Sequence, residues 1–546
     1  MKDKLKISLI FLVILLMVVL KPNHVNLRKF LNLIEAEQQG PFKRIDFFDK
    51  IYNKLNKISE SELLLKFSKL ESFIYDFGSN LNTKRYSLKL SSKKHTKFEV
   101  SIQNINKRFK KDNSNLPEPR SEIVLNSFKN DWQSFQVLVI PIEFDINNIS
   151  INVAKKDINR CKLECFIGEF VNCEKPYYKT DHTGWYVDPL IPLKKYVNKD
   201  SICFIDEVFN FNVKKNQNKS IWFNIYTPEN IESENLNIPL IFKIKNETKS
   251  INLKLKIEDK ILSSKKKFKD IFGFQEDHLI TWNNYDTNLI KSKRKDYYDF
   301  LLKYNLNPVN LYETKTWPPV SDWRYCKNKG ANIVNFTNLS NWKCDSLSYK
   351  KLKIQLGLIG NTYKNKSVMI YIYDELQKKH ISKIKKQYSF FRKIIENYNV
   401  AYTTAENIIN NDEIFQSFRL KKISNLLLKD SSSWNYICNT SVDTNKNFFI
   451  DKPISEIQQL GKILKRNHKK AFLYYGINEW KHNFPKDTIF DKIYNKHEKW
   501  PFKKWNSFTY KNYNGDGQLI YPGLNGEIWP SVRLIHIREM LTYLNN

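Results

Sequence analysis

The sequence is poor in glycine and lacks the motifs on which several large enzyme classes depend. Its 14 glycines form neither a phosphate-binding loop nor a dinucleotide-binding loop. There is no His-Glu-x-x-His zinc motif and no Gly-x-Ser-x-Gly nucleophile elbow. Cys161, Cys165 and Cys173 are close together, but no second pair or nearby histidine completes a zinc site. We therefore expect no metal and no cofactor.

Cysteine is also scarce, and its count is odd. Seven cysteines cannot all pair in a complete disulfide framework. Because unpaired cysteine behaves as a small buried hydrophobic residue, we expect buried thiols, or one or two bridges.

Arginine is scarce although the chain is strongly basic. Only 13 of the 90 basic residues are arginine, and the formal net charge is +33. Proteins that read nucleic acids rely on the forked guanidinium group for bases and phosphates. The lysines here are spread along the chain without a dominant cluster, so a compositional bias explains the charge more simply. We predict no specific nucleic-acid partner, and an anionic-polymer binder is the weakest alternative.

The chain begins with lysines followed by a short apolar run. Residues 7–20 are almost purely apolar, and Lys21 and Pro22 follow them. Such a run is short for a membrane span but typical of an export signal, and no small-x-small cleavage site comes after it. We predict that residues 1–22 are a signal peptide or a signal anchor. The protein is then exported as a secreted, periplasmic or membrane-anchored protein facing outside, which this segment could tether to a membrane.

The pattern of apolar residues changes twice along the rest of the chain. Residues 23–115 have apolar positions spaced by three and four, which predicts a helical extension and a linker. Residues 116–264 contain short β-rich runs separated by turn residues, which predicts a β-sandwich. In residues 265–546 roughly eight short apolar runs alternate with amphipathic helices, which predicts a catalytic (β/α)8 TIM-like barrel. A doubly wound open sheet is the alternative fold for this part.

Two adjacent carboxylates, Asp374 and Glu375, follow the uncharged run Val368–Tyr373. A continuously apolar run of this length suits a strand that is buried on both faces. Where a barrel strand ends, the chain leaves the pleat, so both carboxylates can turn toward the mouth that holds the chemistry of barrel enzymes. The alternative is that Asp374 caps a helix over 377–398 and Glu375 lies in its first turn, near the positive end of the helix dipole.

Aromatic residues accompany the predicted strand ends of the barrel. Sugar rings present apolar C–H faces that stack on aromatic rings, while polar side chains take the hydroxyl groups. Core packing is the alternative for any single ring. The candidate substrate-binding residues are Trp434, Tyr436, Tyr475, Trp480 and Tyr521, and Trp317 and Trp529 belong to the same pattern.

Three other polar residues carry weaker signals. Asp516 in the NGDG stretch is a turn residue or, less simply, a hydroxyl ligand at the barrel mouth. Asp188 is expected to fix a sandwich loop, with the barrel as a candidate partner. His278 follows the first predicted barrel strand and is either structural or close to the site.

Several segments resemble glycoside hydrolase family 123. WQSFQVLVIP (132–141), GWYVDPLIPL (184–193) and KSIWFNIYTP (219–228) are similar to the N-terminal sandwich of that family. Its catalytic barrel is resembled by YIYDE (371–375), WNYICNT (434–440), AFLYYGINEW (471–480), YNGDGQLIYPG (513–523) and SVRLIHIREML (531–541). The segments span roughly residues 120–541 in the order of the family.

The resemblance implies a retaining β-N-acetylgalactosaminidase that acts on a glycan or glycoconjugate by substrate assistance. Glu375 would protonate the leaving oxygen and then activate water as the base. The acetamido oxygen of the substrate would attack the anomeric carbon, so no enzyme nucleophile is needed. Asp374 would orient the acetamido N–H and offset charge on the oxazolinium-like intermediate. Family members usually have proline after the pair, whereas this sequence has Leu376.

Two other functions stay open. The same fold could carry a catalytically inactive carbohydrate-binding protein, or a hydrolase that acts on a different (N-acetyl)hexosamine.

Overall fold

The computed structural model describes residues 98–546, apart from 112–115, 118, 143, 175–182, 208–210, 216, 313–317, 405–420, 426–433, 439–445, 485–499 and 510–512. The chain divides into two compact units, residues 1–81 and 82–546, and every described residue belongs to the second. The predicted signal segment and most of the predicted helical extension therefore lie outside the described residues. Within the described part of the chain, no helix is long and apolar enough to be a membrane span.

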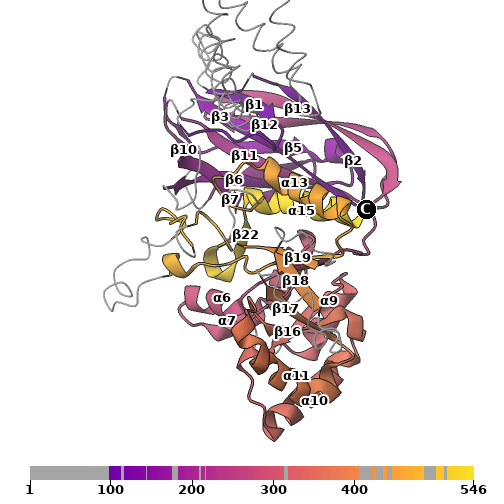
Figure 1. Ribbon diagram of the computed structural model, residues 1–546. Helices are drawn as coiled ribbons and strands as arrows, with labels where there is room; N and C mark the ends of the chain where they lie inside the picture. The colour runs from indigo at the N-terminus through magenta and orange to yellow at the C-terminus, as the bar shows by residue number, and fades with distance from the viewer. Residues whose placement is uncertain are drawn as a thin grey trace, which may run out of the picture. The chain divides into compact units, whose positions relative to one another are not determined.

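The first half of the described chain consists of two sheets that share one hydrophobic core (Figure 1). One sheet has the order β1 (Phe98–Gln103), β3 (Asp131–Pro141), β11 (Lys219–Thr227), β6 (Lys162–Cys173) and β7 (Gly184–Pro192). The other has the order β2 (Glu122–Lys129), β13 (Glu247–Ile261), β12 (Asn235–Ile244), β5 (Ser150–Ala154), β9 (Ser201–Ile205) and β8 (Lys194–Val197). A minor pair, β4 (Ile146–Asn147) with β10 (Asn212–Val213), and the short helix α5 (Lys155–Ile158) complete this part.

Alternating side chains explain why these strands form a two-sheet unit. In β12 every second residue is buried, so one face of the strand packs inward and the other faces solvent. Phe223 of β11 stacks on Phe135 of β3, with ring centroids 4.8 Å apart, and meets Phe242 of β12 edge-on at 6.4 Å. The sheets therefore pack face to face, as the predicted β-sandwich requires. They begin earlier than predicted, because β1 falls inside the segment 23–115.

The second half contains a seven-stranded parallel sheet with helices between its strands (Figure 1). In chain order the strands are β14 (Lys269–Phe272), β15 (Val334–Asn338), β16 (Val368–Tyr373), β17 (Asn399–Thr404), β18 (Lys421–Asn425), β19 (Trp434–Ile437) and β20 (Ala471–Tyr474). The helices are α6 (Glu276–Trp282), α7 (Thr287–Ser292), α8 (Arg294–Lys303), α9 (Val320–Asn328), α10 (Ser346–Gly360), α11 (Ile381–Ile395), α13 (Ser455–Arg466) and α15 (Val532–Asn545). From β15 to β20 each strand pairs with the next along the chain, and β14 pairs with β20.

The edge strands β14 and β15 are linked through residues 306–311 rather than by a ladder. Gly273 and Val309 form a single parallel bridge, and the backbone N–H of Phe274 donates to the Val309 carbonyl at 2.7 Å. On the other side, Asn335 Nδ2 donates to the carbonyls of Asn310 and Leu311 at 2.6 and 3.2 Å. The described strands thus show the predicted parallel β/α organisation, but not a closed (β/α)8 ladder.

The buried strand β16 separates two cores. Its residues Val368, Ile370 and Ile372 pack with the helices into one cluster, whereas Met369 and Tyr371 belong to another. The second cluster collects residues from strands on the β17 side of β16 and from the 306–311 segment: Ile271, Val309, Leu311, Ala401, Tyr436 and Leu473. A run that is apolar at every position is what a strand between two cores needs, which is why this one was predictable.

The two halves meet at a buried ion pair on α15. Arg533 donates through Nε and Nη2 to Asp188 of β7 at 2.9 and 2.8 Å, and Tyr521 Oη donates to Asp188 Oδ2 at 2.6 Å. Both charged side chains are fully buried. Burial by itself lowers the pKa of Arg533, but the charge of Asp188 and its hydrogen bonds outweigh burial and raise that pKa. Asp188 therefore ties a sandwich strand to the half that contains the parallel sheet, as the sequence suggested.

Candidate active site

The turn that follows β16 holds Glu375 in an unusual backbone conformation. Its φ is +48°, in the left-handed region that side chains other than glycine seldom adopt. Two threonines of β17 hold the turn: the N–H of Glu375 donates to Thr403 Oγ1 at 2.8 Å, and Thr404 Oγ1 donates to the Leu376 carbonyl at 3.2 Å. Strain of this kind persists only where the surroundings enforce it, and it is concentrated at functional sites.

Leu376 occupies the position where proline was expected, and its contacts show what leucine provides there. Its side chain is buried, and its N–H donates to the Thr403 carbonyl at 2.8 Å. Proline has no N–H to donate, and it also disfavours helical backbone angles in the residue before it. Leucine therefore keeps both the hydrogen bond and the freedom of Glu375 to take a positive φ.

Asp374 is held by hydroxyl groups from β16, from β17 and from the residue after the 306–311 segment. Tyr371 Oη donates to Asp374 Oδ1 at 2.6 Å, Thr403 Oγ1 donates to the same oxygen at 3.0 Å, and the two hydroxyl oxygens are 2.6 Å apart. Tyr312 also hydrogen-bonds Asp374. Burial first, and then the charges of Asp374, Glu479 and Glu375, raise the pKa of Tyr312 well above its usual value, so this phenol is a hydrogen donor.

The carboxylate pair itself is exposed and does not cap the following helix. Asp374 and Glu375 are both open to solvent, and Cys438 Sγ lies 3.9 Å from Glu375 Oε1. The next helical turn begins at Lys378 with Gln377 as its N-cap, and α11 follows it. The hydroxyl groups around Asp374 take the place that helix N–H groups would have in the capping alternative. The pair is therefore available to a ligand.

A third carboxylate, Glu479, lies near the pair. It follows the end of β20, with its side chain 13% exposed, and its charge raises the pKa of both Tyr312 and Tyr475. Gln275 Nε2 donates to Glu479 Oε1. Sequence patterns had not pointed to Glu479, Tyr312 or Thr403. Their common signal is a polar side chain at or just after the end of a predicted strand.

Asp516 lies beneath Tyr475 as a fully buried carboxyl group. Tyr474 Oη donates to Asp516 Oδ1 at 2.9 Å, and the N–H of Gly517 donates to Tyr474 Oη at 2.8 Å. Burial raises the pKa of Asp516 to about 7, although hydrogen bonds from Tyr474 and Tyr475 and the charge of Arg533 oppose the rise. Asp516 thus supports the tyrosines from inside the protein and is not open at the mouth.

Two of the five candidate aromatic residues lie in the core of the parallel sheet, and a third, Tyr475, is partly exposed next to Glu479. Burial first, and then neighbouring groups that include Glu479 and Tyr312, raise the pKa of the Tyr475 hydroxyl group well above the usual value. Tyr436 is buried in the same cluster as Tyr371. Trp434 is the first residue of β19, and it pairs with Ala471, the first residue of β20. It is buried at the N-terminal edge of the parallel sheet, whereas Asp374 follows the C-terminal end of β16.

The other two candidates are placed in the core, away from the pair. Trp480 has no exposed surface; its Nε1 donates to the Ile520 carbonyl at 2.9 Å and its ring packs edge-on against Trp282. Tyr521 is also fully buried, with its hydroxyl bound to Asp188. A ring without exposed surface cannot stack on a sugar, so this placement does not favour substrate binding by either residue. Trp317 lies outside the described residues.

The remaining polar candidates have structural surroundings. His278 is buried, and its Nδ1 lies 2.7 Å from the Asn478 carbonyl. All seven cysteines are free thiols, and five of them are buried. Among the residues that the structure describes, no cluster of three or more His, Cys, Asp or Glu side chains is arranged to hold a metal ion.

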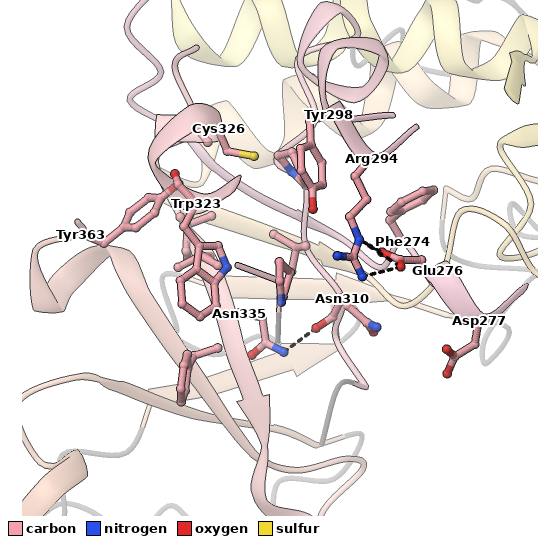
Figure 2. Close-up of a pocket in the computed structure, with 17 residues that line it drawn as sticks. Phe274, Glu276, Asp277, Arg294, Tyr298, Asn310, Trp323, Cys326, Asn335 and Tyr363 are labelled. Atoms are coloured by element: carbon pink, nitrogen blue, oxygen red, sulfur yellow. Dashed lines mark hydrogen bonds and ion pairs between the residues drawn. The ribbon is translucent and has the colours of Figure 1, made fainter. Parts of the chain in front are cut away.

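A cavity of about 110 Å³ lies beside the 306–311 segment. Figure 2 shows its polar groups: Arg294 bonds both oxygens of Glu276, and Asn335 bonds the Asn310 carbonyl. Trp323 and Tyr298 add aromatic walls. The cavity therefore occupies the gap where β15 and residues 306–311 form no ladder, and neither Asp374 nor Glu375 lines it.

Comparison with known proteins agrees with the family resemblance. Residues 297–545 match the sequence profile described as glycoside hydrolase 123, catalytic domain. A solved family 123 glycoside hydrolase from Clostridium perfringens, in work on glycolipid glycan hydrolysis, is similar with a TM-score of 0.56 and 12% identity, over 82% of this chain and 87% of that one. At this identity the likeness shows the fold alone.

More distant structures add little. A glycosyl hydrolase family 2 member from Bacteroides cellulosilyticus gives a TM-score of 0.28 at 12% identity, over 64% of this chain and 44% of that one, which is too low to support an argument. No curated protein matches the chain. The profile match and the family 123 fold nevertheless agree with each other and with the motifs around Asp374 and Glu375. Residues 297–545 therefore match the catalytic domain of glycoside hydrolase family 123, and the fold is similar to that of a solved family 123 enzyme over 82% of this chain.

Proposed function

We propose that the protein is a retaining glycosidase that removes β-linked N-acetylgalactosamine from glycans by substrate-assisted catalysis. The observation that carries the proposal is the turn after β16, which exposes Asp374 and Glu375 side by side while hydroxyl groups and a strained backbone hold them in place. The match of residues 297–545 to the catalytic domain of the family supports hydrolysis of a glycosidic bond as the reaction class.

In the first step the proton of Glu375 passes to the glycosidic oxygen as the bond from that oxygen to the anomeric carbon breaks. The acetamido oxygen of the same sugar forms the new bond to the anomeric carbon, which gives an oxazolinium intermediate. In the second step Glu375 takes a proton from water, and the water oxygen attacks the anomeric carbon as the acetamido oxygen leaves. Two inversions at one carbon retain its configuration.

Asp374 has the surroundings of a group that stabilises the intermediate. Tyr371 and Thr403 hold its Oδ1, and we assign Oδ2 to the acetamido N–H. A carboxylate already oriented by hydroxyl donors needs no rearrangement as positive charge develops on the oxazolinium, which is the condition for large electrostatic stabilisation. The pair thus divides the work: Glu375 transfers protons, and Asp374 orients and stabilises.

We also propose that the parallel sheet closes into a (β/α)8 barrel around this site. The first strand β14 pairs with the last strand β20, and residues 306–311 lie between β14 and β15. Tyr312 is influenced by Asp374 after β16 and by Glu479 after β20. In a flat sheet β16 and β20 would be four strand spacings, or roughly 19 Å, apart. A sheet that curves into a barrel explains better why Asp374 and Glu479 both influence Tyr312.

We propose export and a glycoconjugate substrate as the biological setting. Residues 1–22 carry the export signal or anchor, and a tether would hold the enzyme at a membrane surface. The similar enzyme from Clostridium perfringens is described for glycolipid glycans, so a glycan at a surface is a fitting substrate class. N-terminal sequencing of the exported protein decides between cleavage and anchoring, and an N-terminus at Met1 would favour the anchor.

The proposal is tested by comparing three 4-nitrophenyl substrates: the β-N-acetylgalactosaminide, the β-N-acetylglucosaminide and the plain β-galactoside. We expect the first to be hydrolysed best and the last not at all, because it has no acetamido group. Asp374→Asn should lower kcat/KM by about a hundredfold or more, and a thiazoline analogue of the oxazolinium should bind it more weakly than it binds the wild type.

Each component of the proposal has its own contrary result. A preference for the glucosaminide would change the sugar and keep the mechanism. A glycosyl adduct trapped on Asp374 by a fluorinated sugar would replace substrate assistance with an enzyme nucleophile. Tight sugar binding without any release of free sugar would favour the inactive carbohydrate-binding protein.

A further inference from the structure

Glu479 is held in a fixed position by hydrogen bonds with two distant parts of the chain. Gln275 Nε2 donates to its Oε1, and the backbone N–H of Glu479 donates to the Gly517 carbonyl at 3.0 Å. Gly517 has φ +67°, and a Cβ there would lie 2.7 Å from Glu479 Cγ and 2.5 Å from Tyr475 Oη. Only glycine can therefore occupy position 517 without displacing the glutamate or the tyrosine.

An ion pair does not explain why a carboxylate is placed here. Lys481 Nζ lies 3.6 Å from Glu479 Oε2, but the lysine side chain is 67% exposed. Ion pairs with such an exposed partner contribute little, whereas a carboxylate that is 13% exposed has lost much of its hydration. The fold thus maintains a partly desolvated carboxylate without a strong cationic partner among the described residues.

The position of Glu479 connects it with the catalytic pair. Tyr312 hydrogen-bonds Asp374, and the charges of Asp374, Glu479 and Glu375 all raise its pKa. Tyr475, next to Glu479, is likewise influenced by Tyr312. Three carboxylates therefore lie around one phenol, two of them after β16 and the third after β20. A ligand held over Asp374 and Glu375 would find the Glu479 carboxylate at its rim.

We propose that Glu479 is a sugar-binding carboxylate that accepts hydrogen bonds from ring hydroxyl groups of the N-acetylhexosamine bound over Asp374 and Glu375. This inference rests on the proposed function and names the group that distinguishes hydroxyl positions at the same site. An ionised carboxylate only accepts hydrogen bonds, and sugar hydroxyls are donors that fit it. A site built to bind a hydroxyl group discriminates strongly against an analogue that lacks it, because its polar group is left unpaired.

The test is a cycle between Glu479→Gln and deoxygenated substrates. The probes are 4-nitrophenyl N-acetyl-β-galactosaminide and its 3-deoxy, 4-deoxy and 6-deoxy analogues. For at least one position we expect the wild type to lose roughly 10- to 100-fold in kcat/KM, the range of a hydrogen bond to a charged group. Glu479→Gln should start from a lower value and lose much less at that same position.

Two further variants separate binding from structure. Lys481→Met removes the exposed ion pair and keeps the carboxylate, so it should retain the wild-type loss at every position. Glu479→Asp keeps the charge but shortens the reach, and it supplies the comparison if the glutamine variant has a lowered Tm. Equal losses in the wild type and in Glu479→Gln at all three positions would overturn the inference.

Failure of the proposed function gives a different pattern. If the wild type releases no sugar, the same cycle is measured by calorimetry with N-acetylgalactosamine and its deoxy analogues. A loss of affinity at one position that depends on Glu479 then supports the inference although catalysis has failed. Additive losses, or no binding of any of these sugars, would contradict it.

Discussion

The chain contains two carboxylate clusters that differ in nearly every physical respect. Asp188 is fully buried, bonded by two nitrogens of Arg533 and by Tyr521, and it joins the sandwich to the catalytic half. Asp374 and Glu375 are exposed and lie in a turn with a left-handed residue, and hydroxyl groups rather than a cation hold Asp374.

The difference separates a carboxylate that serves the fold from two carboxylates that we propose serve a reaction. A buried charge is tolerated only with a complementary partner, and such a pair has nothing left to offer a ligand. An exposed acid in a strained turn contributes little to stability, so its position needs another explanation. If the comparison is right, mutations in one cluster change stability and mutations in the other change turnover.

The largest expected effect is on turnover, through Glu375. Glu375→Gln cannot donate the proton that the leaving group needs, so hydrolysis of a natural glycan should fall by about 10²- to 10⁴-fold. An activated aryl leaving group departs without a proton and should lose much less. Because the side chain is exposed, the Tm should stay near the wild-type value. Wild-type turnover of the glycan by this variant would remove Glu375 from its assigned role.

The second effect is on stability, through Asp188. Asp188→Ala leaves Arg533 buried without its partner, which typically costs about 3–5 kcal/mol of unfolding free energy. Activity per folded molecule should change little. The matched control is Glu122→Gln in the exposed pair with Lys254, where a loss below about 1 kcal/mol is expected. Urea denaturation measures both, and similar losses in the two variants would break the comparison.

Asp516 gives a third effect, which depends on pH. Burial raises its pKa from 3.8 to about 7 in the folded protein, so the folded state keeps a proton that the unfolded state releases. The Asp516 contribution to the free energy of unfolding is therefore greatest below about pH 4 and decreases by up to about 1.4 kcal/mol per pH unit until about pH 7. Asp516→Asn should remove this slope relative to the wild type. Parallel stability curves for the two proteins from pH 4 to 7 would contradict the assignment.

How far the sequence could predict the site depends on how local each feature is. The strand before Asp374 was predictable, because a run buried on both faces is apolar at every position. The sandwich strands were predictable from alternation, although the short run at 98–103 was assigned to the wrong segment. The positive φ of Glu375 was not predictable, since contacts from Thr403 and Thr404, well over twenty residues away along the chain, enforce it.

Features that depend on strand ends far apart in the sequence were harder to predict. Trp480 and Tyr521 follow apolar runs just as Tyr475 does, but their side chains lie in the core. Trp480 packs against Trp282, and Tyr521 donates a hydrogen bond to Asp188. Their sequence surroundings resemble those of an aromatic residue at a mouth, so composition cannot tell the two apart. Tyr312 and Glu479 lie 167 positions apart in the chain numbering. Tyr312 follows the 306–311 segment, which bridges to the residue after β14, and Glu479 follows β20, which pairs with β14.

The smallest effect sharpens the comparison within the active cluster. Tyr371→Phe removes one of the hydroxyl donors that hold Asp374 and leaves the aromatic ring in the core. Losing a hydrogen bond to a charged group should lower kcat/KM for the acetamido substrate by roughly tenfold. The control is Tyr363→Phe, which removes a hydroxyl bonded to the Trp323 carbonyl on the helix side of the sheet. Both variants should lose about 1 kcal/mol of stability, but only Tyr371→Phe should slow hydrolysis and weaken thiazoline binding. If the two variants lose activity equally, the hydroxyl on Asp374 serves the fold, and the distinction between the two clusters no longer holds at this residue.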